Sequence, residues 1–295
     1  MAHATRDRWA EWLAKRRFGG DPELRADLLA KLVETRDTVL DRAQLQKDET
    51  LLDVGCGEGL IGFGALERCA DSVIFSDIST QLLDFCREGA SDLGILESCR
   101  FVESSAEDLG PVENASVDVV TTRSVLIYVQ DKAAAFAEFA RVLRPGGRIS
   151  LAEPINRFGS KERGEDTFAG YPIDGLEEIA AKVRAVFEEI QPPESDPMLD
   201  FDERDLLRLV EAAGFFPIRL TLDARIEGLG PRSWEGSLDT AWNPNVPTVR
   251  EAMGQALSTK EQERLTAGLR PLVEGGHGEW RMAFAHLAAT KPEAA

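Results

Sequence analysis

Hydrophobic residues alternate between two patterns over residues 50 to 155. Short apolar runs at 51–54, 72–77, 99–103 and 117–126, and the run that follows Gly147, predict five buried strands. Stretches with helical spacing lie between them at 60–68, 78–93 and 132–143. Alternation of strand and helix is typical of a parallel sheet covered by helices on both faces. The sequence therefore predicts an α/β fold for this part of the chain.

Further helical patterns flank this alternation. They lie at 7–17 and 22–44 before it, and at 176–190, 201–213, 248–257 and 258–273 after it. Two more strands are predicted at 217–226 and 280–290. The segments at about 156–200 and 227–278 are then insertions into a minimal α/β fold. We predict a helical N-terminal lid at 1–44 and one domain at 45–295 that carries both insertions as caps.

The first predicted helix has an apolar face that a sheet does not need. Trp9, Trp12 and Leu13 lie on it, and Phe18-Gly19-Gly20 follows. Two interpretations stay open. The face packs against the rest of the protein, or the segment closes over a substrate and hinges at the two glycines.

Three glycines at alternate positions, Gly55, Gly57 and Gly59, separate the first strand from the helix at 60–68. Glycine adopts backbone conformations that other residues avoid and lets the main chain approach a ligand. A phosphate-binding loop would continue with Lys and Ser or Thr, but Leu60 and Ile61 stand there. A dinucleotide loop has two residues between its second and third glycines, but Glu58 stands there alone. The loop predicts a cradle for a nucleoside-like ligand, with tight strand–helix packing as the alternative.

Residues 53–59, DVGCGEG, resemble the first motif of the class I S-adenosylmethionine-dependent methyltransferases. Similar segments follow in the family's order at 72–77, 99–109, 117–126 and 144–147, the last being the turn RPGG. The chain is most similar to the group that contains ubiquinone and menaquinone biosynthesis enzymes and many natural-product methyltransferases. The resemblance implies a Rossmann-like, doubly wound, mostly parallel seven-stranded sheet with an antiparallel last strand.

The resemblance also implies S-adenosylmethionine as the methyl donor and S-adenosylhomocysteine as the product. Asp77 matches the acid that binds the ribose hydroxyls, although an N-cap for the next helix would explain it too. Ser105 stands where the family often has an acid for the adenine amino group, so that contact can shift to Glu107 or the backbone. Arg123 should line the site at the end of its strand, or pair with surface acids. The expected donor-binding residues are Asp53, Gly55, Gly57, Asp77, Ile78, Ser105, Ala106, Glu107, Arg123, Arg17 and Arg36, the last two for the methionine carboxylate.

Methyl transfer needs a general base only when the acceptor must lose a proton. The candidates are His277, Tyr128 and Glu153. Each has a structural alternative: a solvated loop histidine, a half-buried core tyrosine, and a carboxylate paired with Arg157. Three aromatic residues of the insertions could wall an apolar acceptor pocket: Tyr171, Trp234 and Trp242.

Composition narrows the partners. The chain has 34 basic and 52 acidic residues and a net charge of −18, which disfavours nucleic acid and anionic membranes, although residues 15–17 form a local basic run. Its four cysteines lack zinc-site spacing and predict reduced thiols, no metal site and a cytoplasmic protein. No segment fits a signal peptide or a membrane span. Monomer and homodimer both stay open.

We therefore predict methyl transfer to a small-molecule acceptor through an oxygen, nitrogen, carbon or sulfur atom. The alternatives are an S-adenosylmethionine-binding protein that catalyses another reaction, such as a cyclisation, and a ligand-sensing module. A nicotinamide-linked oxidoreductase ranks third because of the loop spacing.

Overall fold

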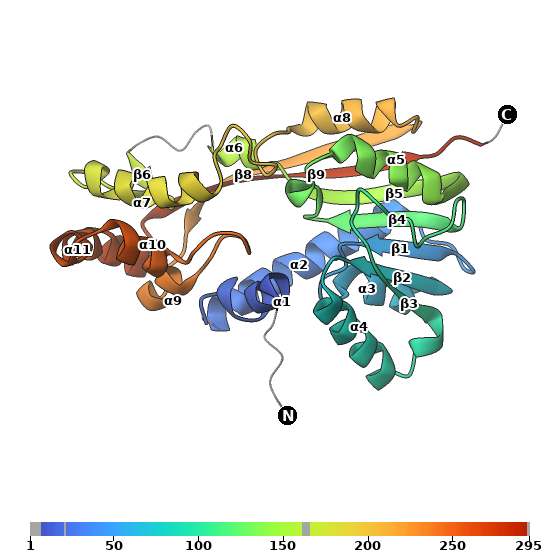
Figure 1. The fold of residues 1–295 in the computed structure, drawn as a ribbon, viewed down its shortest axis with the longest axis horizontal. Coiled ribbons are helices and arrows are strands. Elements are labelled where there is room, and N and C mark those ends of the chain that lie inside the picture. Colours follow the sequence, from blue (N-terminus) through green and yellow to red (C-terminus); the bar gives the residue numbers. More distant parts are fainter. Residues whose placement is uncertain (1–6, 21, 161–165, 294–295) are drawn as a thin grey trace. The chain divides into compact units, whose positions relative to one another are not determined.

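The computed structural model describes residues 7–20, 22–160 and 166–293 (Figure 1). Residue contacts divide the chain into two compact units. The sheet unit consists of the described residues within 30–155, 201–223 and 284–295, and the helical unit of those within 1–29, 156–200 and 224–283. Each unit has a hydrophobic core of its own.

A seven-stranded sheet in the order β3-β2-β1-β4-β5-β9-β8 organises the fold (Figure 1). β1 to β5 pair in parallel, and β9 is antiparallel to β5. The predicted fold class, a mostly parallel seven-stranded sheet with an antiparallel last strand, is confirmed. The strands are β1 (Thr50–Val54), β2 (Ser72–Asp77), β3 (Cys99–Glu103), β4 (Val117–Arg123), β5 (Leu143–Pro154), β8 (Ile218–Leu229) and β9 (Gly278–Thr290).

Helices cover the parallel strands. α3 (Leu60–Arg68) packs on β1 and β2, α4 (Thr80–Asp92) on β2 and β3, and α5 (Lys132–Val142) on β5 and α8 (Glu203–Ala212). The core beside β2 is aromatic, because the Phe75 ring stacks on Phe101 at 5.4 Å between centroids and lies 5.1 Å from Phe63. β1 and β2 are buried along almost their whole length, as parallel strands covered on both faces should be. Short helices η2 (Leu96–Ser98) and η3 (Leu126–Tyr128) complete this region, and α2 (Pro22–Ala43) precedes β1.

The helical unit is built from the chain's first helices and the two insertions. Its elements are α1 (Arg8–Glu11), the π-helix η1 (Trp12–Arg16), α6 (Asn156–Ser160), the hairpin β6 (Thr167–Phe168) and β7 (Tyr171–Pro172), α7 (Glu177–Ile190), α9 (Trp234–Asp239), α10 (Val249–Ala256) and α11 (Thr259–Gly275). The Trp12 indole N–H donates to the carbonyl of Ala241 at 2.9 Å, and Arg16 pairs with Glu251. The N-terminal segment therefore packs against the second insertion, and its action as a lid stays a prediction.

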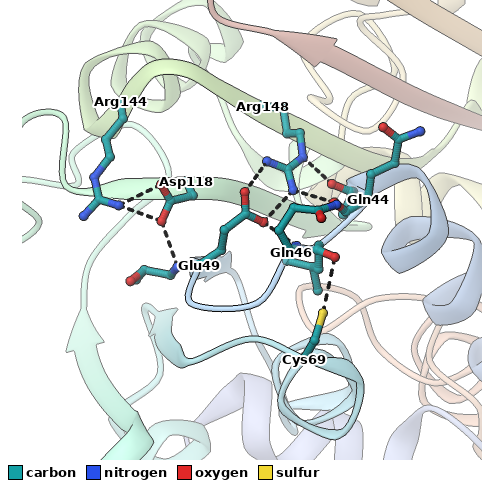
Figure 2. A network of polar contacts seen from close by, with 10 residues as sticks. Gln44, Gln46, Glu49, Cys69, Asp118, Arg144 and Arg148 are labelled. Atoms are coloured by element: carbon teal, nitrogen blue, oxygen red, sulfur yellow. Dashed lines mark hydrogen bonds and ion pairs between the residues drawn. The ribbon is translucent and has the colours of Figure 1, made fainter.

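A polar network ties together the amino-terminal ends of β1, β4 and β5 (Figure 2). Arg148 of β5 donates to both carboxylate oxygens of Glu49, at 2.8 and 2.6 Å, and to the carbonyl of Gln44 at 2.8 Å. Asp118 of β4 accepts from Arg144 and from the backbone N–H of Thr50 at 2.9 Å. These contacts therefore lie at the opposite ends of the parallel strands from their carboxyl ends.

The sequence misplaced some local features. The helix predicted at 7–17 divides into α1 and η1. The turn predicted at 144–147 lies inside β5, where Gly146 has a φ of +77° and the pairing with β4 shifts register. A local irregularity thus replaces a break in the strand. No helix among the described residues has the length and apolar character needed to cross a membrane.

Candidate functional site

The glycine loop between β1 and α3 is built on left-handed backbone. Gly55, Gly57 and Gly59 have φ values of +64°, +55° and +80°. A Cβ on Gly55 would lie 2.4 Å from Cγ2 of Val125, and one on Gly59 would lie 2.5 Å from the Phe63 ring. Glycine is therefore required at both positions for conformation and for space.

Asp77 fixes this loop from the carboxyl end of β2. Its carboxylate accepts the backbone N–H groups of Gly57 and Ser79, each at 2.9 Å, and the residue is 7% exposed. Ser79 caps α4 by accepting from Leu82 N–H at 3.2 Å, so Asp77 is not the helix cap. A carboxylate has further lone pairs that can accept hydrogen bonds from a ligand. The neighbouring Ile78 is 49% exposed, which leaves an apolar side chain uncovered beside the loop.

Asp53 of β1 stabilises the start of α3, the helix that follows the glycine loop. Its carboxylate is buried and accepts Gly62 N–H at 3.1 Å and the Thr121 hydroxyl at 3.0 Å. Burial raises the pKa of Asp53 to about 7, and the two hydrogen bonds oppose that rise. The side chain joins α3 to β4, and its expected direct contact with the donor stays a prediction.

Glu153 of β5 holds the segment that follows β4. Its carboxylate, which is fully buried, accepts the Thr122 hydroxyl at 2.7 Å and the backbone N–H groups of Val125 and Leu126 at 3.0 Å. Burial raises the pKa of Glu153 to about 7. Because Val125 packs on Gly55, Glu153 positions the glycine loop through this segment. Its suggested action as a general base stays a prediction.

Arg123 ends β4 beside these carboxyl groups. Its guanidinium is half-buried and has no hydrogen-bond or ion-pair partner in the described parts of the chain. Burial lowers its pKa, whereas the charges of Asp53 and Glu153 and the nearby Tyr128 raise it. The alternative role as a surface ion-pair partner finds no support here. The adjacent Ser124 has a φ of +57°, which is unusual for a residue with a side chain.

The segment after β3 contains the expected adenine contacts. Glu107 is half-buried, and its carboxylate accepts Asp131 N–H at 2.6 Å and the Ser105 hydroxyl at 3.3 Å. Ala106 is buried. Glu107 thus joins this segment to the N-terminus of α5, and the adenine roles of Ser105, Ala106 and Glu107 stay predictions.

The two arginines expected at the methionine carboxylate have other contacts. Arg36 pairs with Asp37 at 2.8 Å and packs beside Gly64 of α3. Arg17 belongs to the helical unit, where its guanidinium lies 5.3 Å from the Trp12 ring and 5.4 Å from the Phe18 ring. Neither arginine shows the unpaired guanidinium that Arg123 presents.

The remaining base candidates differ in setting. Tyr128 is half-buried in η3 and lies close enough to Arg123 to influence its charge. His277 is exposed in the helical unit, and its ring stands beside Gly275. The structure thus groups Tyr128 and Glu153 around Arg123, whereas His277 belongs to the other unit.

Sequence reasoning missed the meeting of two cysteines at the glycine loop. The thiols of Cys56 and Cys86 both approach the carbonyl of Gly57, at 3.9 and 3.3 Å. The Cys86 thiol and burial together raise the pKa of Cys56 well above its usual range. The Cys56 thiol is therefore a protonated packing group, and only the buried face of α4 could have indicated its contact with Cys86. Among the described residues, no group of three or more potential metal ligands is placed to hold an ion.

A family model described as a methyltransferase domain matches residues 52–151. The chain is 32% identical over 141 residues to a ubiquinone/menaquinone biosynthesis C-methyltransferase of Hahella chejuensis, covering 46% of this chain and 56% of that protein. It is 33% identical over 101 residues to a tRNA 5-carboxymethoxyuridine methyltransferase of Escherichia coli K12, covering 34% and 38%. The matched part thus spans less than two thirds of these relatives' length.

Solved structures show the same fold at lower identity. Geranyl diphosphate C-methyltransferase of Streptomyces coelicolor A3(2), in complex with Mg²⁺, geranyl diphosphate and S-adenosyl-L-homocysteine, superposes with a TM-score of 0.51 and 20% identity, covering 94% of this chain and 88% of that one. The [4+2]-cyclase SpnF superposes with a TM-score of 0.50 and 20% identity, covering 89% and 82%. Residues 52–151 thus match a methyltransferase domain, and the strand order and the glycine loop of the structure agree with that match.

Proposed function

We propose that this protein transfers the methyl group of S-adenosylmethionine to a small-molecule acceptor. The observation that carries the proposal is the left-handed glycine loop, whose Gly57 N–H is held by Asp77 at the carboxyl end of β2. Ligands of open α/β sheets bind at this end of the strands. A Cβ on Gly55 would meet Val125, so the loop keeps this conformation only with glycine at that position.

The described side chains around the loop suit the three parts of the donor. Asp77 has acceptor capacity for ribose hydroxyls, and Ile78 presents an exposed apolar side chain to an adenine face. Arg123 supplies guanidinium donors, which bind a carboxylate in bidentate geometry, and it lacks a partner among the described residues. We therefore assign the methionine carboxylate to Arg123, in preference to Arg17 or Arg36.

When bound, S-adenosylmethionine would supply an electrophilic methyl group on a positively charged sulfur. An acceptor lone pair would attack the methyl carbon in line with the carbon–sulfur bond, which breaks. The protein's residues orient the two reactants and exclude water. Glu153 and Asp53 hold the loop segments that do so. Tyr128 is the proposed base where an acceptor must lose a proton, because it lies beside Arg123.

The acceptor class follows from charge. One relative is named a tRNA methyltransferase and another a ubiquinone/menaquinone biosynthesis C-methyltransferase, whereas this chain carries a net charge of −18. Such a field repels a polyanion and is compatible with a small molecule. The four cysteines form no disulfide, which suits a reducing, cytoplasmic compartment.

A second candidate keeps the donor site and changes the reaction to a cyclisation or to ligand sensing. The fold shared with a [4+2]-cyclase favours retaining it, because the fold alone does not select the chemistry. Turnover separates the candidates. Incubation of the purified protein with S-adenosylmethionine and a panel of phenols, amines, thiols and carboxylic acids should release S-adenosylhomocysteine with at least one acceptor. Release with no acceptor class, together with tight donor binding, would favour the second candidate.

Asp77→Ala tests the donor site directly. Loss of the carboxylate removes the ribose acceptor and releases Gly57 N–H, so we expect the binding of S-adenosylhomocysteine to weaken by about 1–3 kcal/mol, measured by calorimetry. The matched control is Asp84→Ala on α4, since Asp84 is exposed and pairs with Arg87 in the same helix turn. Unchanged affinity in a folded Asp77→Ala variant would remove Asp77 from the site.

A further inference from the structure

Tyr171 carries a buried hydroxyl without a hydrogen-bond partner among the described residues. The residue is 5% exposed and belongs to the hydrophobic core of the helical unit. Its ring packs on Gly278, where a Cβ would lie 2.6 Å from Cε1 of the tyrosine. A buried hydroxyl that makes no hydrogen bond destabilises the fold, because it has lost its contact with water and gained no partner. A phenylalanine would fill this space without that cost, so packing does not explain the hydroxyl.

Arg232 lies near Tyr171 in the helical unit, and its side chain also has no polar partner among the described residues. Its guanidinium is half-buried and makes no hydrogen bond or ion pair within the described parts of the chain. Its backbone N–H donates to the carbonyl of Val273 at 3.1 Å. The preceding Pro231 packs on Gly276, where a Cβ would lie 2.7 Å from the proline nitrogen. Tyr171 and Pro231, which precedes Arg232, thus both pack on residues 276–278, where α11 connects to β9.

The two groups are electrostatic neighbours. Burial raises the pKa of Tyr171, and the positive charge of Arg232 opposes that rise. The phenol is therefore neutral near neutral pH and offers an O–H donor. Beside it stands a guanidinium, which offers only donors. Two unpaired donors, one of them charged, match a ligand group that carries acceptor oxygens and negative charge.

We propose that Tyr171 and Arg232 bind the carboxylate or phosphate group of the small-molecule methyl acceptor. The rest of the acceptor is apolar, because two residues of the same core lie near the pair. Leu229 packs on Gly278 as Tyr171 does, and Trp234 follows Arg232 by two residues in the sequence. The naming of the ligand as the acceptor rests on the proposed function. The existence of the oxyanion site does not, since both residues belong to the helical unit.

The test uses the full chain, two variants and two probes. Inorganic phosphate and benzoate are titrated into the wild-type protein, and binding is followed by calorimetry or by ligand-observed NMR. We expect binding of at least one probe, and a loss of about tenfold or more in both Tyr171→Phe and Arg232→Gln. Binding of phosphate alone identifies a phosphorylated ligand, and binding of benzoate alone identifies an aromatic or aliphatic carboxylate. Arg270→Gln on α11 is the matched control, because Arg270 is exposed and paired with Glu274.

Two further measurements separate a binding role from a structural one. Tyr171→Phe removes no hydrogen bond seen in the structure, so its unfolding free energy without probe should equal or exceed that of the wild type. Wild-type protein that binds neither probe, or variants that bind as the wild type does, would overturn the proposal. S-adenosylhomocysteine binding is measured in parallel. Its absence in the wild type would refute the proposed function, whereas the probe titrations decide the oxyanion site independently.

Discussion

At the scale of single residues, the backbone of Gly55 and the side chain of Val125 occupy one small space. Gly55→Ala would place a methyl group 2.4 Å from Val125 Cγ2 on a backbone with a φ of +64°. We expect a loss of about 1–3 kcal/mol in unfolding free energy and at least about tenfold weaker binding of S-adenosylhomocysteine. Chemical denaturation and calorimetry measure the two effects.

Gly254→Ala in α10 is the control for that substitution. A Cβ on Gly254 would meet no atom within 4 Å, and the residue lies in a helix. Alanine favours a helix over glycine by up to about 1 kcal/mol, so this variant should be neutral or more stable. If Gly55→Ala behaved like Gly254→Ala, the close approach of Val125 would not constrain the loop.

Asp53 and Glu153 give the protein an unusual pH dependence. Burial raises both pKa values to about 7, so the folded protein retains protons that the unfolded chain has lost. Stability therefore falls as the pH rises from roughly 4.5 to 7, by at most about 1.4 kcal/mol per pH unit for each group, and the penalty is complete above 7. Acids with lowered pKa values, such as Glu261 at about 2, act below this window.

Asp53→Asn isolates one of these contributions. Asparagine can accept Gly62 N–H and donate to the Thr121 hydroxyl, so the contacts survive while the titration disappears. Denaturation near pH 5 and near pH 8 should show the variant gaining stability relative to the wild type at the higher pH. An equal difference at both pH values would mean that Asp53 titrates normally in the folded protein.

At the scale of elements, the sequence predicted the strands well where both faces are covered. β1 and β2 are continuous apolar runs because parallel strands covered on both faces bury their side chains. Gly55 follows the end of β1 and Asp77 ends β2, with the spacing that the family's motifs have. The hairpin of β6 and β7 and the helices α6 and α9 have no such periodic signal. The loop-positioning role of Glu153 was also unreadable, because its amide partners lie 27 and 28 residues away in sequence.

Arg148 allows stability and donor binding to be tested separately. Its side chain is 18% exposed and joins β5 to Glu49 and Gln44, which precede β1 (Figure 2). These contacts lie at the amino-terminal ends of the parallel strands, whereas the glycine loop follows the carboxyl end of β1. Arg148→Met should cost about 1–3 kcal/mol of unfolding free energy. Arg144→Met, whose side chain is 48% exposed, should cost less than about 1 kcal/mol. Both variants should bind S-adenosylhomocysteine with wild-type affinity. Weakened binding by folded Arg148→Met would show that the amino-terminal and carboxyl-terminal ends of the parallel strands are coupled.

At the scale of the whole molecule, the methyltransferase domain could be predicted from the sequence, and the acceptor could not. The donor-binding signals lie in one continuous stretch, which the family model matches at residues 52–151. The helical unit is assembled from three separate segments of the chain. Tyr171 and Arg232, whose side chains have no polar partner in the described ranges, are 61 residues apart in sequence. Polar groups without partners are a property of packing, so no sequence pattern marks them.

Net charge gives the last prediction, which concerns nucleic acid. The basic run at residues 15–17 is the sequence's best candidate for a phosphate contact, but its charges are already engaged: Lys15 pairs with Glu11 at 3.1 Å, Arg16 pairs with Glu251, and Arg17 lies over aromatic rings. Because the net charge of the whole chain is −18, we expect no binding of bulk tRNA at physiological salt and no transfer of labelled methyl groups to it. Electrophoretic mobility shifts over a range of salt concentrations measure this. Binding that weakens steadily with the logarithm of salt concentration would identify a phosphate-binding surface, and would move the acceptor class from small molecules to RNA.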